Sequence, residues 1–295
     1  MRIKIKSTFK LLQEAFKEWQ EDKVSLLAAA LAYYTVFSIT PLLVIAIAIA
    51  VAVIGQDTAR VENYEQITQL VGSQGAQAIE MALANADRPQ FSSIASIISI
   101  VILLIGASGV FAQLQEALNT VWDVKTKPNG GIWEFIRKRL LSFGMVLVIG
   151  FLLLVSLVLS AILAGIGKLE IDILPGLAPA WQLFNSAISF GFVSLLFAFI
   201  YYYLPDVKIR WQDVWVGAII TALLFTMGKL LIGLYLGRGS LGSAYGAAGS
   251  LIVFLTWVFY SAQILLFGAE FTQVYARRYG RKIRPNKHAE LTKSL

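Results

Sequence analysis

The chain has 295 residues, of which 57% are hydrophobic and only 15% are charged, and its formal net charge is +7. Soluble domains carry about 25% charged residues, so this chain has too few charges to cover the surface of a soluble protein of its length. It has no cysteine, which excludes disulfides and thiolate chemistry, and its single histidine, His288, lies in a basic tail where a catalytic or metal-binding role is not expected.

The N-terminal segment, residues 1–23, is predicted to be a cytoplasmic interfacial helix. It contains aromatic and aliphatic residues that repeat at helical spacing and share one face, namely Phe9, Leu12, Phe16 and Trp19. A helix with such a face and charges on the other lies in the plane of the membrane surface.

Residues 24–276 are predicted to form one membrane domain. A helix that spans a bilayer needs roughly 17–25 mostly apolar residues. Six stretches are long enough: Leu26–Ile54, Phe91–Phe111, Leu140–Ile166, Trp181–Leu204, Val214–Leu236 and Ala247–Phe271. None has the alternating pattern of a barrel strand. The predicted fold is therefore all-α, a six-transmembrane-helix bundle with amphipathic interfacial helices.

The longest connection on the outer side, residues 55–90, has apolar residues at helical spacing and is predicted to be helical. It either covers the mouth of a cavity or serves as a packed connector. The last segment, residues 277–295, is predicted to be a basic cytoplasmic tail.

Lysine and arginine residues outside the spans indicate the orientation. Twenty lie on the side of both termini and four on the other side, so both termini are predicted to be cytoplasmic. The basic rim on that side is expected to meet anionic membrane lipids. Because these residues flank spans and form no separate basic domain, nucleic acid is not an expected partner.

The first span carries polar groups and a helix breaker. Tyr33, Tyr34, Thr35, Ser38 and Pro41 interrupt a run of small aliphatic residues. Proline removes a backbone donor and predicts a kink, and the hydroxyls can bond the freed carbonyls. The hydroxyl groups either pack the bundle around the kink or line a pathway or binding site, as at the broken helices of transporters.

The last two spans contain polar residues that are rare in hydrocarbon. Lys229 either lines a cavity or extends to the outer interface. Glu270 closes the last span and is expected to meet Arg210, Arg277 or Arg278, and Gln263 lies deeper in the same span.

Glycines cluster around the turn between these two spans. Gly233 and Gly237 have the spacing that lets helices approach closely. The match of residues 237–242 to a dinucleotide-binding pattern is rejected, because it follows a membrane helix and not a strand. No catalytic signature, metal site or cofactor motif is found, so the chain is not expected to be an enzyme or to need a cofactor.

Three segments in order, residues 28–43, 117–124 and 245–276, together with residues 205–218, resemble the YihY/BrkB family of bacterial inner-membrane proteins. The matching positions are Ala32, Tyr33, Tyr34, Ser38, Pro41, Asn119, Trp122, Tyr245, Gly246, Trp257, Gly268 and Glu270. The resemblance implies six transmembrane helices in the bacterial plasma (inner) membrane. It also brings an older ribonuclease BN label, which the lack of a metal-ligand cluster contradicts.

Two functions remain open at this stage. The first is a transporter or a lipid or envelope-precursor flippase without its own ATPase, with lipid as substrate and with Tyr33, Tyr34, Thr35, Ser38, Pro41, Lys229, Tyr245, Gln263 and Glu270 as candidate pathway residues. The second is a non-transporting scaffold for envelope assembly. A homo-oligomer or an envelope protein partner fits either function.

Overall fold

The computed structural model describes residues 5–38, 94–127, 178–238, 249–280, 283–286 and 288–292. The chain forms two compact units. One comprises Met1–Ala32 with Gln113–Leu295, and the other comprises Tyr33–Ala112. Most of the described helices and all of the described strands belong to the larger unit.

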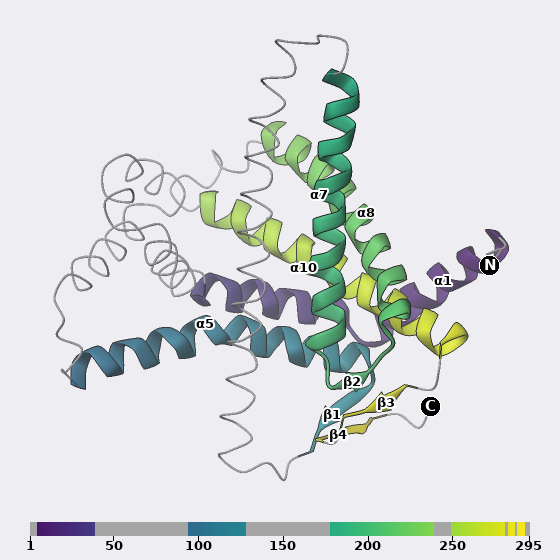
Figure 1. The fold of residues 1–295 in the computed structure, drawn as a ribbon. Coiled ribbons are helices and arrows are strands. Elements are labelled where there is room, and N and C mark those ends of the chain that lie inside the picture. Colours follow the sequence, from purple (N-terminus) through teal and green to yellow (C-terminus); the bar gives the residue numbers. More distant parts are fainter. Residues whose placement is uncertain are drawn as a thin grey trace. The chain divides into compact units, whose positions relative to one another are not determined.

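The described elements are mainly long helices (Figure 1). They are α1 (Ile5–Glu21), the helix Val24–Ser38, α5 (Ile94–Val121), α7 (Ala178–Tyr203), α8 (Trp211–Arg238) and α10 (Gly249–Tyr279). This confirms the predicted helical class and the predicted helix at the N-terminus.

Three of these helices are long and apolar enough to cross a membrane, with spans at Ser186–Tyr203, Trp211–Lys229 and Leu251–Tyr279. They coincide with the fourth, fifth and sixth predicted stretches, and the second predicted stretch overlaps α5. The first stretch is described only as far as Ser38. The third stretch and the outer segment 55–90 lie outside the described residues.

Within the larger unit, α8 packs against both α7 and α10, and α1 packs against α10. Leu11 and Ala15 of α1 share a buried cluster with Phe271, Val274 and Tyr275 of α10. The helix at Val24 follows α1 after a short turn, in which Lys23 has a positive φ of 51°.

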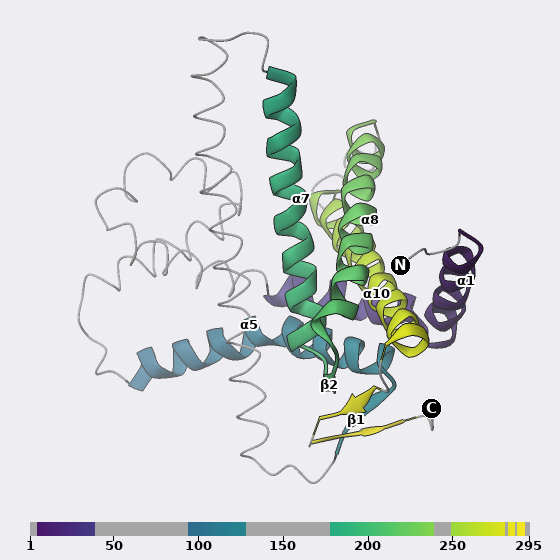
Figure 2. The ribbon, with the colours of Figure 1, turned by 45° about the vertical axis from the view of Figure 1, so that its right-hand side comes forward.

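Two small antiparallel sheets join the C-terminal segment to earlier connections (Figure 2). Strand β1 (Val124–Thr126), directly after α5, pairs with β4 (Ala289–Leu291), and β2 (Val207–Lys208), between α7 and α8, pairs with β3 (Arg284–Pro285). The segment predicted as a basic tail therefore contains two paired strands, which no pattern in the sequence predicts.

Candidate functional site

Helices α8 and α10 meet along a line of small residues. A Cβ atom added to Gly217 would overlap Thr272, one added to Gly268 would overlap Thr221, and one added to Gly228 would come within 2.5 Å of the Tyr260 hydroxyl. We call this line the α8–α10 seam. Small residues at such positions let two membrane helices approach closely enough for extensive van der Waals contact.

The hydroxyl groups at the seam are hydrogen-bonded. Thr221 Oγ1 donates to the Gly217 carbonyl at 2.7 Å, and Thr272 Oγ1 donates to the Gly268 carbonyl at 2.6 Å. The hydroxyl of Tyr201, on α7, donates to the Leu265 carbonyl at 2.7 Å and lies 2.9 Å from Thr221 Oγ1. These hydrogen bonds allow three hydroxyl groups to lie among apolar helices, where a polar group without a hydrogen bond costs roughly several kcal/mol.

A second polar region lies where α5 ends. Asn119 Nδ2 donates to Asp206 Oδ2 at 3.0 Å, and the backbone N–H of Asp206 donates to Asn119 Oδ1 at 2.8 Å. The amide nitrogen and the amide oxygen of Asn119 are thus both hydrogen-bonded to Asp206, a residue of the α7–α8 connection. Thr126 Oγ1 also reaches Asp206 Oδ2, at 3.5 Å.

The next residue of this region is Asp123, which is buried and has a positive φ of 53°. Aspartate is one of the few side chains that tolerates this backbone region, and it ends α5 there. Its carboxylate accepts a hydrogen bond from Gln273 Nε2 of α10 at 2.9 Å, and its carbonyl accepts one from the backbone N–H of Thr292 at 2.8 Å. We call Asn119, Asp123, Asp206 and Gln273 the polar junction.

Glu270 lies one turn before Gln273 on α10 and is completely buried, with 0% of its surface exposed. Among the described residues, no group of three or more His, Cys, Asp or Glu side chains could hold a metal ion. The hydrogen bonds of the polar junction connect α5, the α7–α8 connection and α10.

The start of α8 is stabilised by an ion pair. Arg210 Nε and one of its terminal nitrogens donate to the two oxygens of Asp213 at 2.9 and 2.8 Å. Its hydrogen bond to Asp213 raises the pKa of the Arg210 guanidinium. Asp213 lies in the first turn of α8, where a carboxylate interacts favourably with the helix dipole.

The side-chain amide of Gln263, in the middle of α10, connects this helix to the end of α1. Trp19 Nε1 donates to Gln263 Oε1 at 3.1 Å, and Gln263 Nε2 donates to Ser25 Oγ at 3.1 Å. Farther along, Arg277 donates to Glu14 at 3.2 Å and to Glu18 at 2.6 Å.

The predicted site residues of the first span lie in the smaller unit. Ser38 is buried, and its hydroxyl donates to the Gly106 carbonyl of α5 at 2.7 Å. Tyr33 and Tyr34 are exposed, with their rings in an edge contact, and Thr35 is half-buried. Pro41 lies outside the described residues.

The predicted site residues of the last two spans have different environments. Lys229 is exposed and stands at the end of its apolar span, Gln263 is half-buried, and Glu270 is buried. The described ion pairs of the three arginines expected near Glu270 go to Asp213, Glu14 and Glu18. Tyr245 lies outside the described residues.

The polar junction was only partly visible in the sequence. In the sequence Asn119 is a motif position, but no pattern distinguishes Asp123, Asp206 or Gln273 from other polar residues. The available signal was Asp206, an acid just after the predicted span that ends at Leu204, whereas Asp123 lies well beyond the predicted span that ends at Phe111. That signal gave a position at the membrane surface but no partner.

Comparisons with known proteins agree on a membrane family. A family model described as "Virulence factor BrkB" matches residues 15–292. A UPF0761 membrane protein of Mannheimia succiniciproducens is 28% identical over 280 residues, covering 93% of this chain and 92% of the relative. A UPF0761 membrane protein of Albidiferax ferrireducens is 27% identical over 272 residues, covering 90% of this chain and 61% of the relative.

The chain thus spans about three fifths of the length of several curated relatives, of which the Albidiferax protein is one. No solved structure matches the chain.

Proposed function

Since the chain belongs to the BrkB family of membrane proteins, we propose that it is a multi-pass permease of the bacterial inner membrane that moves a lipid or an envelope precursor across the bilayer. Its sequence contains no nucleotide-binding motif, so net movement against a gradient would take its energy from an ion gradient or a partner protein, whereas exchange between leaflets needs neither. The proposed topology has six spans with both termini in the cytoplasm, and it rests on the distribution of lysine and arginine.

Glu270 is the observation that carries this proposal. It is completely buried within the apolar span Leu251–Tyr279 of α10. A carboxylate inside a membrane segment is costly, and such residues commonly belong to substrate or ion pathways. Lys229, Gln263 and Tyr245 in the same part of the chain are proposed to act with Glu270. In the smaller unit, Tyr33, Tyr34, Thr35, Ser38 and Pro41 are proposed as a separate set that contacts the transported molecule.

A leaflet-exchange measurement tests the proposal. The full chain is reconstituted into liposomes that contain a fluorescent phospholipid, and a membrane-impermeant quencher reports the fraction that reaches the outer leaflet. Wild type is compared with Glu270→Gln, which keeps the shape of the side chain and removes its charge. The control is Glu21→Gln, an exposed glutamate of α1. Lys229→Ala tests the second ionisable residue.

The expected result is protein-dependent exchange that falls at least tenfold in Glu270→Gln and stays at the wild-type rate in Glu21→Gln. Size-exclusion profiles establish that each variant is folded. If folded wild type gives no exchange above empty liposomes, unaided lipid movement is ruled out. If Glu270→Gln exchanges as fast as wild type, the proposed role of Glu270 is wrong.

A scaffold for envelope assembly is the second candidate, and the α8–α10 seam favours it. The hydroxyls of Tyr201, Thr221 and Thr272 are used in bonds within the bundle, which is the pattern of a packed structural interface. A scaffold would bind an envelope protein or a second copy of the chain. It would show no leaflet exchange, and a stable complex would be recovered after crosslinking in cells.

A further inference from the structure

Helix α1 presents two different apolar surfaces. Leu11 and Ala15 are buried against α10. Phe9, Leu12 and Phe16 point away from that contact, and 64%, 39% and 51% of their respective surfaces are exposed. We call these three residues the outer face of α1. Three large exposed apolar side chains on one face of a charged helix indicate a surface that an apolar partner covers.

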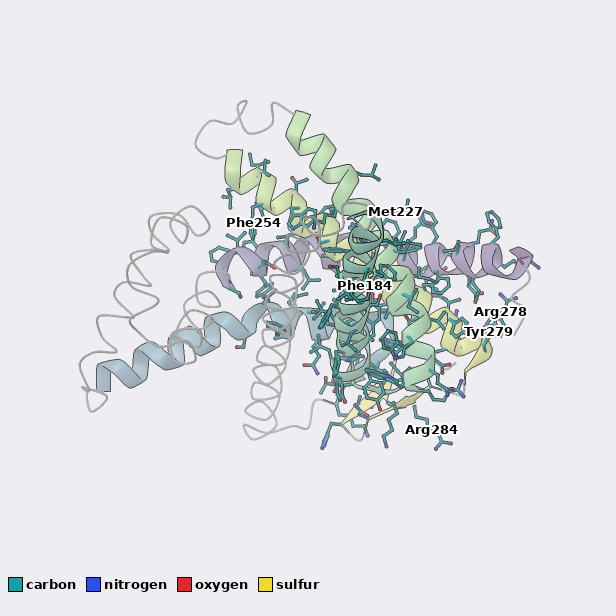
Figure 3. All side chains as sticks on the ribbon, turned by 45° about the horizontal axis from the view of Figure 1, so that its top comes forward. Phe184, Met227, Phe254, Arg278, Tyr279 and Arg284 are labelled. Atoms are coloured by element: carbon teal, nitrogen blue, oxygen red, sulfur yellow. The ribbon has the colours of Figure 1, made fainter. Side chains whose placement is uncertain are left out.

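The net charge near α1 depends on its ion pairs with α10. Between Phe9 and Glu21 the helix has three glutamates and only two lysines, Lys10 and Lys17. Arg277 pairs with Glu14 and Glu18, and Arg278, labelled in Figure 3 at the end of α10, lies 3.6 Å from Glu14. The two arginines offset Glu14 and Glu18, and Glu21 pairs with Lys17 at 3.2 Å, so the charge balance of α1 and its contact becomes positive.

The position of α1 along α10 fits the membrane surface. Helix α10 has 31 residues and is therefore about 46 Å long, which exceeds the roughly 30 Å hydrocarbon thickness. Its end at Arg277 and Arg278 is charged and follows the apolar part of the helix. That end belongs in the headgroup region. Leu11 and Ala15 of α1 pack beside it, and Trp19, farther along α1, reaches Gln263 in the middle of α10.

We infer that the outer face of α1 is a docking surface for an anionic membrane leaflet, with Phe9, Leu12 and Phe16 inserted among the lipids and Lys10 and Lys17 at the headgroups. Amphipathic helices of this kind insert about 5–10 Å into the boundary between headgroups and acyl chains. Arg277 touches no lipid in this arrangement. It acts as a positioning residue by holding Glu14 and Glu18 away from the anionic surface. The inference concerns membrane attachment and holds whether or not the protein transports a lipid.

Because the chain has no cysteine, single cysteines can carry spin labels without background. Leu12→Cys reports on the outer face, and Gln13→Cys, an exposed polar neighbour, is the matched control. The full-length protein is placed in nanodiscs of phosphatidylcholine alone or with added phosphatidylglycerol, whose anionic headgroups give the surface a negative potential. The accessibility of each label to oxygen and to a water-soluble nickel complex gives its depth.

The label at position 12 is expected to be accessible to oxygen and shielded from nickel, whereas the label at position 13 should be accessible to nickel. The label at position 12 should lie deeper in the anionic nanodiscs. Replacing Lys10 and Lys17 with glutamine, or Arg277 with glutamine, should abolish this dependence on lipid charge. Arg284→Gln, an exposed arginine of β3, should leave it unchanged.

Two results would overturn the inference. In the first, the label at position 12 is as accessible to nickel as the label at position 13 in both lipids, which means that the outer face is in water. In the second, labels at position 12 of two copies show dipolar broadening in nanodiscs, which means that a second copy covers the outer face.

Discussion

The α8–α10 seam and the polar junction hold the same unit together by different means. At the seam, glycines allow close approach, and Thr221 and Thr272 each bond a carbonyl four residues earlier on their own helix. At the polar junction, side chains from distant parts of the chain bond each other, as in the pairs Asn119–Asp206 and Asp123–Gln273.

This difference follows from the side chains that line each region. The seam has glycines and threonines, and between membrane helices shape and close contact decide the packing. The polar junction has carboxylates and amides, which can be buried when they are hydrogen-bonded. Substitutions should therefore act through size at the seam and through lost hydrogen bonds at the polar junction.

The largest effect is expected from Gly268→Ala at the seam. The added Cβ would overlap Thr221 Oγ1 and lie 2.5 Å from the Tyr201 hydroxyl. Overpacking of this kind costs about 1–3 kcal/mol. The free energy of unfolding, measured by denaturant titration in mixed micelles, should fall by that amount.

Gly191→Ala on α7 is the matched control, because no heavy atom lies within 4 Å of the added Cβ. It should leave the free energy of unfolding unchanged or raise it by about 0.4–1 kcal/mol. Equal losses in the two variants would show that steric fit does not control the seam.

A smaller effect is expected from Asn119→Ala at the polar junction. It removes the two bonds to Asp206 and leaves polar atoms of Asp206 without those partners, which costs about 1–3 kcal/mol when such groups are buried. Because Asp206 is only half-buried, the lower end of that range is expected in the same unfolding titration.

A double-mutant cycle with Asp206→Ala isolates the pair, and the coupling energy should be at least about 0.5 kcal/mol. Thr120→Ala is the control, because its hydroxyl bonds Glu116 of its own helix, and its effect should stay within about 0.5 kcal/mol. Additive losses in the cycle would contradict a direct interaction between Asn119 and Asp206.

The sequence predicted the helices better than it predicted their contacts. Long apolar runs were sufficient to place α7, α8 and α10. The spacing of Gly233 and Gly237 predicted a close helix contact, which stays a prediction because the surroundings of these two residues are not described. The described contact uses Gly217, Gly228 and Gly268, and only the position of the neighbouring helix identifies these glycines.

The candidate site was harder to predict for the same reason. Asn119 and Asp206 are 87 positions apart, and Asp123 and Gln273 are 150 positions apart. Each is an ordinary polar residue near the end of a span when considered alone. Helix α1 was easier to predict, because the pattern of Phe9, Leu12 and Phe16 lies within a single helix, and its interfacial position stays a prediction. The pathway residues remain a prediction.

The smallest effect on stability is expected from a test of the strand pairing at the C-terminus. Lys125 lies opposite Glu290 in the β1–β4 pair, and Lys208 lies opposite Arg284 in the β2–β3 pair. All four side chains are exposed, so cysteine substitutions there should change the free energy of unfolding by less than about 0.5 kcal/mol.

Opposite residues in such pairs have Cβ atoms about 4.5–5.5 Å apart, so a short bifunctional thiol reagent should link 125 with 290 and 208 with 284. The crossed pairs, 125 with 284 and 208 with 290, are the controls and should react more slowly. Equal reaction of all four pairs would show that the C-terminal segment does not hold this register. Both sheets begin within a few residues of Asp123 and Asp206. Selective reaction would therefore show that the two sheets, like the polar junction, hold the ends of α5 and α7 in place.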